Sequence, residues 1–153
     1  MMFVIARLSG FSRRLQMGKL PEFIDFQHSD SIIISETDPH GTIIHANDNF
    51  CDISGYALGE LVGKPHNIIR HPTMPKELFR HLWTTIKEGG VFRGIIRNRK
   101  RDGSHYWVNA TIMPVYHGDQ IARYIGGRHF ISDEKLAEEL FRNQATKFGW
   151  GDF

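Results

Sequence analysis

Apolar and polar positions alternate in five segments of the chain, which is the pattern of half-buried β-strands. The segments form two groups, a pair near the start and three in succession further on. Turn-forming residues separate the neighbours within each group, at 38–41, 101–103 and 117–119. The predicted strands are 31–37, 42–45, 91–100, 104–115 and 120–131.

Apolar residues at helical spacing fill the intervals between these strands. A helix is expected from Pro75, which suits a first turn, to the Gly-Gly pair at 89–90, which ends it. Ser132 is expected to cap a final helix that runs to about Lys147, and the glycine-broken tail 148–153 is expected to be loose. Two shorter helices are predicted at 47–53 and 58–62.

The first 28 residues form a segment of their own. Residues 1–19 carry four basic side chains and no acidic one, and their apolar residues recur at helical spacing. Arg7 interrupts the apolar stretch and no small-residue cleavage site follows, so this is not a secretory signal. We expect an amphipathic cap helix that packs on the domain or on a second copy of the chain. A helix on an anionic membrane surface and a frayed end are the alternatives.

Two strands, several short helices, a longer helix, three strands and a last helix describe an α+β domain. Three consecutive antiparallel strands and one hairpin predict a five-stranded antiparallel sheet, with the helices between its second and third strands on one face. This arrangement encloses an apolar cavity between the sheet and the helices, which is a natural ligand site. The expected organisation is a cap at 1–28, the α+β domain at 29–131, and a C-terminal helix with its tail at 132–153.

Composition places the chain among ordinary globular domains. It has 153 residues, 41% hydrophobic and 24% charged, a mean hydropathy of −0.34, and no apolar run near the ~18 residues of a membrane span. With 19 Lys and Arg against 17 Asp and Glu, it lacks the basic stripe of a nucleic-acid-binding protein. Its one cysteine, Cys51, excludes an internal disulfide and a cysteine-based zinc site, and fits a reducing compartment.

Aromatic residues and histidines are abundant, with 11 Phe, 4 Tyr, 3 Trp and 9 His, and both indicate a pocket. The histidines lack the paired spacing of a metal site on a predicted helix, and apart from His71 they are predicted to be polar residues of the surface or of strands. A Gly-Gly pair at 126–127 inside the last strand predicts a bulge or a close backbone approach. The sequence shows no nucleophile elbow, phosphate loop or paired catalytic carboxylates, so we expect a binding domain and not an enzyme.

Two segments resemble the PAS family. At 41–50 the chain has the sequence GTIIHANDNF, followed by GY at 55–56, which is similar to the family's opening pattern G-x-I-x-x-x-N-x-x-F…GY. The segment 97–107, RNRKRDGSHYW, resembles the late PAS hairpin, where K-D-G-x-x-x-W is common. The resemblance covers about 31–131 and implies the PAS fold, a five-stranded antiparallel sheet with short helices on one face.

A narrower resemblance is to the FAD-binding PAS domain of Aer-type aerotaxis receptors. It rests on 45–50 (HANDNF), 63–75 (GKPHNIIRHPTMP) and 92–108 (FRGIIRNRKRDGSHYWV), of which RHPxMP is the specific part. It implies a cytoplasmic domain that holds FAD and reports redox state to a chemotaxis signalling module. The chain departs from the pattern at Thr73, where those receptors usually have Asp. It also continues only with one helix and a tail, so we expect a stand-alone domain or one that acts in trans.

Three polar residues are candidate FAD contacts. Arg70 and His71 lie in the loop before Pro72, where a guanidinium suits a pyrophosphate and an imidazole suits a flavin or phosphate oxygen, although both residues also fit an exposed loop. Asn98 lies in a strand, where Asn is disfavoured. Alternation places Asn98 on the same face as Ile96, which indicates that its amide points inward, where it matches the edge of a flavin ring.

Four further candidates have a structural alternative that the sequence leaves open. Asn47 precedes a helix and suits a helix cap as well as a ligand contact. Trp83, Phe79 and Phe92 suit the wall of an aromatic pocket as well as the core. Cys51 is interpreted as a small buried residue, because the cysteine of light-sensing LOV domains lies in the helix that corresponds here to 67–71.

The resulting hypothesis is a cytoplasmic redox or oxygen sensor that binds FAD and signals to a partner protein, as a homodimer, through its N-terminal or C-terminal helix. The runner-up is a cofactor-free module that dimerises through its sheet and cap. The third is a haem-based gas sensor, since some PAS domains bind haem through a histidine.

Overall fold

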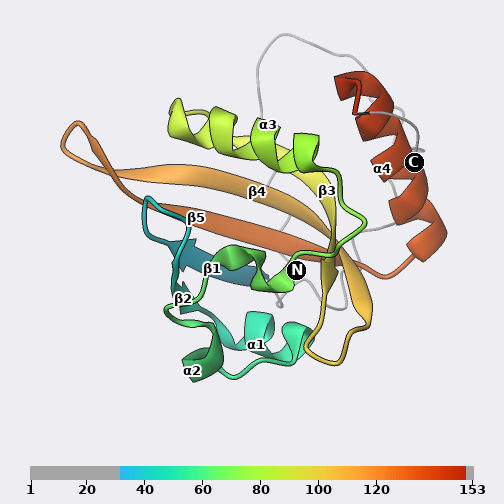
Figure 1. The fold of residues 1–153 in the computed structure, drawn as a ribbon, viewed down its shortest axis with the longest axis horizontal. Coiled ribbons are helices and arrows are strands. Elements are labelled where there is room, and N and C mark those ends of the chain that lie inside the picture. Colours follow the sequence, from blue (N-terminus) through green and yellow to red (C-terminus); the bar gives the residue numbers. More distant parts are fainter. Residues whose placement is uncertain (1–31, 151–153) are drawn as a thin grey trace, which may run out of the picture.

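The computed structural model describes residues 32–150 and shows one five-stranded antiparallel sheet (Figure 1). The strands lie side by side in the order β2-β1-β5-β4-β3, so the first strand pairs with the last. This topology confirms the α+β sheet that the order of strands predicted. The strands are β1 (Ile33–Thr37), β2 (Ile43–Ala46), β3 (Phe92–Arg99), β4 (His105–His117) and β5 (Gln120–Ile131).

All three predicted turns form, and an aspartate fixes two of them. In the first hairpin, Asp38 Oδ1 accepts hydrogen bonds from the backbone N–H groups of His40 and Thr42, at 2.8 and 3.0 Å. Gly41 takes a φ of +88°, a left-handed conformation in which a Cβ is strained. In the β3–β4 hairpin, Asp102 Oδ1 accepts from Ser104 N at 2.9 Å. Both turns are therefore fixed by an aspartate that bonds its own backbone two residues on.

Helices fill the long connection between β2 and β3, and α3 extends across one face of the sheet over β4 (Figure 1). A 3₁₀ turn, η2, was not predicted. At α4 the prediction of a Ser132 cap is wrong, because Asp133 takes the cap position and its Oδ1 accepts from Leu136 N at 3.0 Å. The helices are α1 (Asp48–Ser54), α2 (Leu58–Leu61), η2 (His66–Ile69), α3 (Lys76–Lys87) and α4 (Glu134–Phe148).

The helix α4 packs beside β3 and β4 at the outer edge of the sheet (Figure 1). Trp107 of β4 is buried there with its ring 5.7 Å from that of Phe141. The amide of Gln144 bonds both backbone groups of Ile95, accepting from its N–H at 2.7 Å and donating to its carbonyl at 3.0 Å. The predicted loose tail is wrong at Trp150, which is buried and stacks on Phe148. The helix that follows the sheet is thus fixed to its outermost strand.

The predicted N-terminal cap at 1–28, with its amphipathic helix, lies outside the described residues. None of the helices between residues 32 and 150 is long and apolar enough to cross a bilayer.

Candidate functional site

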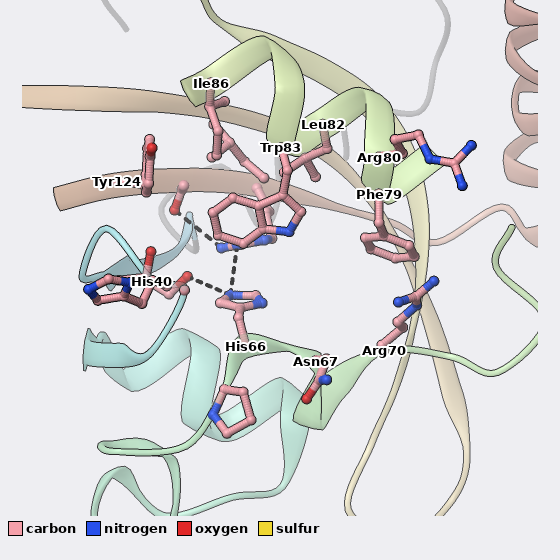
Figure 2. Close-up of a pocket in the computed structure, with 17 residues that line it drawn as sticks. His40, His66, Asn67, Arg70, Phe79, Arg80, Leu82, Trp83, Ile86 and Tyr124 are labelled. Atoms are coloured by element: carbon pink, nitrogen blue, oxygen red, sulfur yellow. Dashed lines mark hydrogen bonds between the residues drawn. The ribbon is translucent and has the colours of Figure 1, made fainter. Parts of the chain in front are cut away.

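A pocket of about 370 Å³ opens between α3 and the sheet (Figure 2). Its size is within the range of small-molecule sites. One wall comes from α3, the floor from β1, β4 and β5, and the opposite wall from the β1–β2 turn and η2. The lining residues are Ser35, Thr37, His40, Gly41, Pro65, His66, Asn67, Arg70, Phe79, Arg80, Leu82, Trp83, Ile86, Ile112, Tyr124, Gly126 and Arg128.

The α3 wall is apolar and aromatic, because Phe79, Leu82, Trp83 and Ile86 recur on one side of the helix. The Trp83 ring meets the Tyr124 ring edge to face, with centroids 5.6 Å apart and planes at 84°. Figure 2 shows Trp83 projecting from α3 into the space above His66. Such a wall suits a flat aromatic ligand.

The floor of the pocket is polar and centres on Arg128 of β5. Its Nη1 donates to the carbonyl of Gly126 at 3.2 Å, and its Nη2 lies 3.1 Å from Nε2 of His66. Ser35 Oγ lies 3.0 Å from the same imidazole nitrogen. A guanidinium can only donate, so Nε2 is the acceptor and the His66 ring carries its proton on Nδ1.

Burial and charge keep His66 neutral. Burial is the main cause that lowers the pKa of His66 to about 3, and the neighbouring positive charge of Arg128 adds to it. Burial also lowers the pKa of Arg128 to about 10, which leaves the guanidinium charged at neutral pH. The pair is therefore a neutral imidazole that supports a buried cation.

Arg128 is the charged member of the buried side chains between residues 32 and 150, with 3% of its surface exposed. The guanidinium of Arg128 lies over the aromatic ring of Phe50, with 5.6 Å between Cζ and the ring centroid. Within the described chain it has no ion pair with a carboxylate, and the residues that line the pocket there include no acid. Among residues 32–150, the floor thus holds a positive charge without a counter-charge.

Gly126 makes room for this arginine. A Cβ built on Gly126 would lie 2.8 Å from Nη2 of Arg128, whereas one on Gly127 would meet Ile32 at an ordinary 3.9 Å. The close backbone approach predicted for the Gly-Gly pair is thereby confirmed at the first glycine.

Three of the seven sequence candidates line the pocket. Phe79 and Trp83 belong to the α3 wall, and Arg70 lies at the rim with its guanidinium carbon 3.8 Å from the Phe79 ring centroid. The exposed Arg80, the residue after Phe79 on α3, also lines the pocket. The rim therefore carries two cationic groups that water can reach.

Asn98 is buried, with 5% exposed, on the sheet face that alternation predicted. It pairs across the strands with Tyr106, whose hydroxyl is buried, and its backbone bridges to that of Arg70. His71 Nδ1 lies 2.7 Å from Thr73 Oγ1, which also accepts from Arg97. Neither Asn98 nor His71 lines the pocket, so their contact with a ligand stays a prediction.

The two remaining candidates lie within the fold. Asn47 caps α1, where its Oδ1 accepts from Phe50 N and from Ile34 N, both at 3.0 Å, and its Nδ2 donates to the Ile32 carbonyl at 2.7 Å. Phe92 is buried against His81 of α3. Cys51, also outside the pocket lining, lies partly buried on α1. Asn47 is therefore the helix cap that the sequence allowed for. A ligand contact by Asn47 or Phe92 stays a prediction.

Sequence reasoning missed His66 and Arg128. The interpretation of His66 as a surface or strand residue is wrong, because it lies in the pocket wall above the floor. Arg128 was not among the sequence candidates, because charged residues of a strand are usually exposed. One signal was available for Arg128, a glycine two residues earlier on the same strand face, which leaves space beside the backbone.

The PAS fold family profile matches residues 43–127, which include η2, α3 and β4. The chain belongs to the PAS fold family. This PAS domain is 44% identical over 115 residues to the aerotaxis receptor of Escherichia coli, a match that covers 74% of the chain and 23% of the receptor. It is 30% identical over 125 residues to a nitrogen fixation regulatory protein of Klebsiella oxytoca, covering 81% of the chain and 25% of that protein. The chain thus spans a quarter of these relatives or less.

Solved structures show the same PAS fold. A light-oxygen-voltage domain studied with a flavin analogue superposes with a TM-score of 0.69 at 21% identity, covering 78% of this chain and 91% of that one. The dark structure of the Aureochrome1 light-oxygen-voltage domain also gives 0.69 at 21% identity, covering 79% and 89%.

Proposed function

We propose that this PAS domain binds the flavin of FAD in the pocket between α3 and the sheet and senses redox state or oxygen. The observation that carries the proposal is the pocket itself, a space of about 370 Å³ with an aromatic wall and a floor of hydrogen-bonding groups. The likeness to an aerotaxis receptor supports the sensory assignment. The domain is then a sensor in which the cofactor, and not a catalytic group of the chain, carries the chemistry.

The donor set fits a flavin ring. The ring is flat and largely apolar on its faces, which suits the space beside Trp83, and its edge carries carbonyl oxygens and ring nitrogens that accept hydrogen bonds. Arg128 supplies donors at the floor, and the hydroxyl of Thr37 is buried there without a partner within the described chain. An unpaired buried hydroxyl is costly unless a ligand bonds it.

The rim fits the rest of the dinucleotide. Arg70 and Arg80 carry guanidinium groups at the rim, and guanidinium groups bind phosphate oxygens well. His71 and Thr73 follow Arg70 in the same loop, so a contact of His71 with the nucleotide part is retained in the proposal. Asn98 lies behind Arg70 and is retained as a residue that supports the site from β3.

When bound, flavin supplies reversible electron transfer. The floor network joins β1, η2 and β5 through Ser35, His66 and Arg128. A changed hydrogen bond at this floor biases the packing of three elements at once, which is a shift between two populations of the domain. We propose that a cytoplasmic signalling protein reads this shift through α4 or through the N-terminal segment, in a homodimer.

An absorption spectrum of the purified full chain tests the proposal. Flavin gives two broad bands in the near ultraviolet and the blue, and heat denaturation should release FAD that chromatography identifies. A sharp Soret band would instead show haem. A protein that stays colourless after incubation with excess FAD, FMN and riboflavin overturns the flavin assignment and favours a cofactor-free interaction module.

A further inference from the structure

Arg128 is a buried cation whose hydrogen-bonding capacity exceeds what its surroundings use. A guanidinium has five N–H donors. The described chain offers Arg128 two acceptors, the Gly126 carbonyl and the His66 imidazole, and both are neutral. A buried charge that lacks a counter-charge destabilises a fold unless something pairs with it.

The rest of the floor is also made of donors or of groups already engaged. Ser35 Oγ lies 3.0 Å from the imidazole nitrogen that Arg128 also contacts, and Thr37 has a buried hydroxyl without a partner in the described chain. The charged side chains of the lining are Arg70, Arg80 and Arg128, all positive. A ligand that completes this floor therefore presents acceptors and negative charge.

We propose that Arg128 binds the negative charge that develops on the edge of the flavin ring, so that the pocket holds the reduced ring more tightly than the oxidised one. This inference rests on the proposed flavin site. The oxidised ring is neutral. Two electrons from a reductant and one proton from solvent give a reduced ring with one negative charge. Because binding favours the charged form, the bound flavin has a higher midpoint potential than it would have without Arg128.

The depth of Arg128 favours the ring over the phosphates as its partner. Phosphate groups are strongly hydrated, and the rim offers them the exposed Arg80 and the half-buried Arg70. Arg128 lies beneath them at 3% exposure, with its guanidinium against the backbone of Gly126. A charge at that depth is screened little by solvent, so it acts strongly on the group directly above it.

The test compares Arg128→Gln, which removes the charge and keeps an amide donor, with Arg128→Lys, which keeps the charge. Arg93→Gln is the matched control, because Arg93 is an exposed residue of β3 outside the pocket lining. The midpoint potential of bound flavin is measured at pH 8 by titrating the full-length protein with dithionite beside a reference dye. Arg128→Gln should weaken the preference for the reduced ring tenfold to a hundredfold, which lowers a two-electron midpoint by about 30 to 60 mV. Arg128→Lys should recover at least half of that shift, and Arg93→Gln should match wild type.

Two further measurements separate the competing explanations. Binding of riboflavin, FMN and FAD shows whether Arg128 acts on the ring or on phosphate: a loss confined to the two phosphorylated flavins, at an unchanged midpoint, overturns the inference. Urea unfolding of flavin-free protein should find Arg128→Gln at least as stable as wild type, because an unpaired charge is gone. A less stable Arg128→Gln would mean that the fold itself requires Arg128, and would also overturn it.

The outcomes also separate this inference from the flavin site. If wild type binds flavin and Arg128→Gln keeps its midpoint, the inference is wrong and the flavin site stands. If no form of the protein binds any flavin, the proposed function and the inference fall together.

Discussion

The guanidinium of Arg128 occupies the space that a side chain on Gly126 would need. A Cβ at Gly126 would lie 2.8 Å from Nη2 of Arg128, closer than real Cβ contacts, and 3.2 Å from its Nη1 and Cζ, which is tighter than most. Gly126 and Arg128 are two residues apart on β5, so they lie on the same face of the sheet. In the sequence G-x-R at 126–128, the missing side chain of Gly126 therefore leaves the space that the guanidinium of Arg128 occupies.

Gly126→Ala should displace Arg128 from the floor and destabilise the domain. Overpacking at a buried position costs about 1–3 kcal/mol, and flavin retention should fall with it. Gly127→Ala is the matched control, because its Cβ meets Ile32 at 3.9 Å on the other face. It should stay within about 0.5 kcal/mol of wild type in urea unfolding. Equal unfolding curves for the two variants would contradict the assigned packing.

Asn47→Ala should lower the free energy of unfolding by about 2–4 kcal/mol. The substitution removes a helix cap, worth about 1 kcal/mol, and leaves the Ile34 N–H and the Ile32 carbonyl without this partner, at about 1–3 kcal/mol. Asn49→Ala removes a single 3.3 Å bond to the same carbonyl and should cost about 0.5 kcal/mol or less. The prediction fails if urea titrations give the two variants the same midpoint.

Acid should destabilise the domain through His66. Its pKa is about 3 in the folded state against 6.5 as the ordinary value, so the unfolded chain binds the proton first as the pH falls. The free energy of unfolding is therefore constant above pH 6.5 on this account and decreases between about 6.5 and 3, by up to about 1.4 kcal/mol per pH unit. Between pH 7.5 and 5.0 the loss due to His66 is roughly 2 kcal/mol.

His66→Gln removes this titration. Urea unfolding at the two pH values should show a drop smaller than that of wild type by roughly 2 kcal/mol. His117→Gln, at an exposed position where β4 ends, should keep the full drop of wild type. A drop of the same size in His66→Gln and wild type would show that His66 does not hold its neutral form in the folded protein.

Trp83→Leu should weaken flavin binding more than Trp83→Phe. An aromatic pair contributes about 0.5–1.5 kcal/mol beyond its buried area, so loss of the ring should reduce affinity roughly twofold to tenfold. Phenylalanine keeps a flat ring opposite Tyr124 and should restore most of the loss. Titration of flavin-free protein with FAD, followed by flavin fluorescence, gives both affinities; equal affinities would place the ring away from Trp83.

Local patterns predicted most of the fold. Alternation from Phe92 to Arg99 located an edge strand within one residue, because one of its faces is buried and the other is half solvated. The cap of α4 was misplaced by one residue, since Ser132 and Asp133 both suit a cap and only the entry angle of the chain distinguishes them. Burial of Trp150 escaped prediction because His81 of α3, one of the side chains that cover it, is remote in the sequence.

The site residues that belong to a sequence motif or to the apolar side of a helix were predicted. Those that come together only through long-range packing were missed. Arg70 came from RHPTMP, and Phe79 and Trp83 from spacing on α3. His66 and Arg128 are 62 positions apart. Pairing of β5 with β1 and the bond from His66 N–H to the Gly41 carbonyl, which holds η2 against the β1–β2 turn, bring them side by side. No local sequence pattern contains this contact, so the buried charge of Arg128 could be recognised only in the structure.

The pairing of Gln144 with Ile95 has a consequence for how copies of this domain behave at high concentration. β3 is an outermost strand, and such strands expose backbone groups onto which a foreign strand can add. Here a side-chain amide takes both the N–H and the carbonyl of Ile95, and Met74 Sδ accepts from the N–H of Arg97 further along. The strand at the opposite edge, β2, has four residues, so it exposes few backbone groups to a foreign strand. Because the Gln144 amide already bonds these two groups, a strand of a second copy cannot pair with them, which disfavours edge-to-edge aggregation through β3.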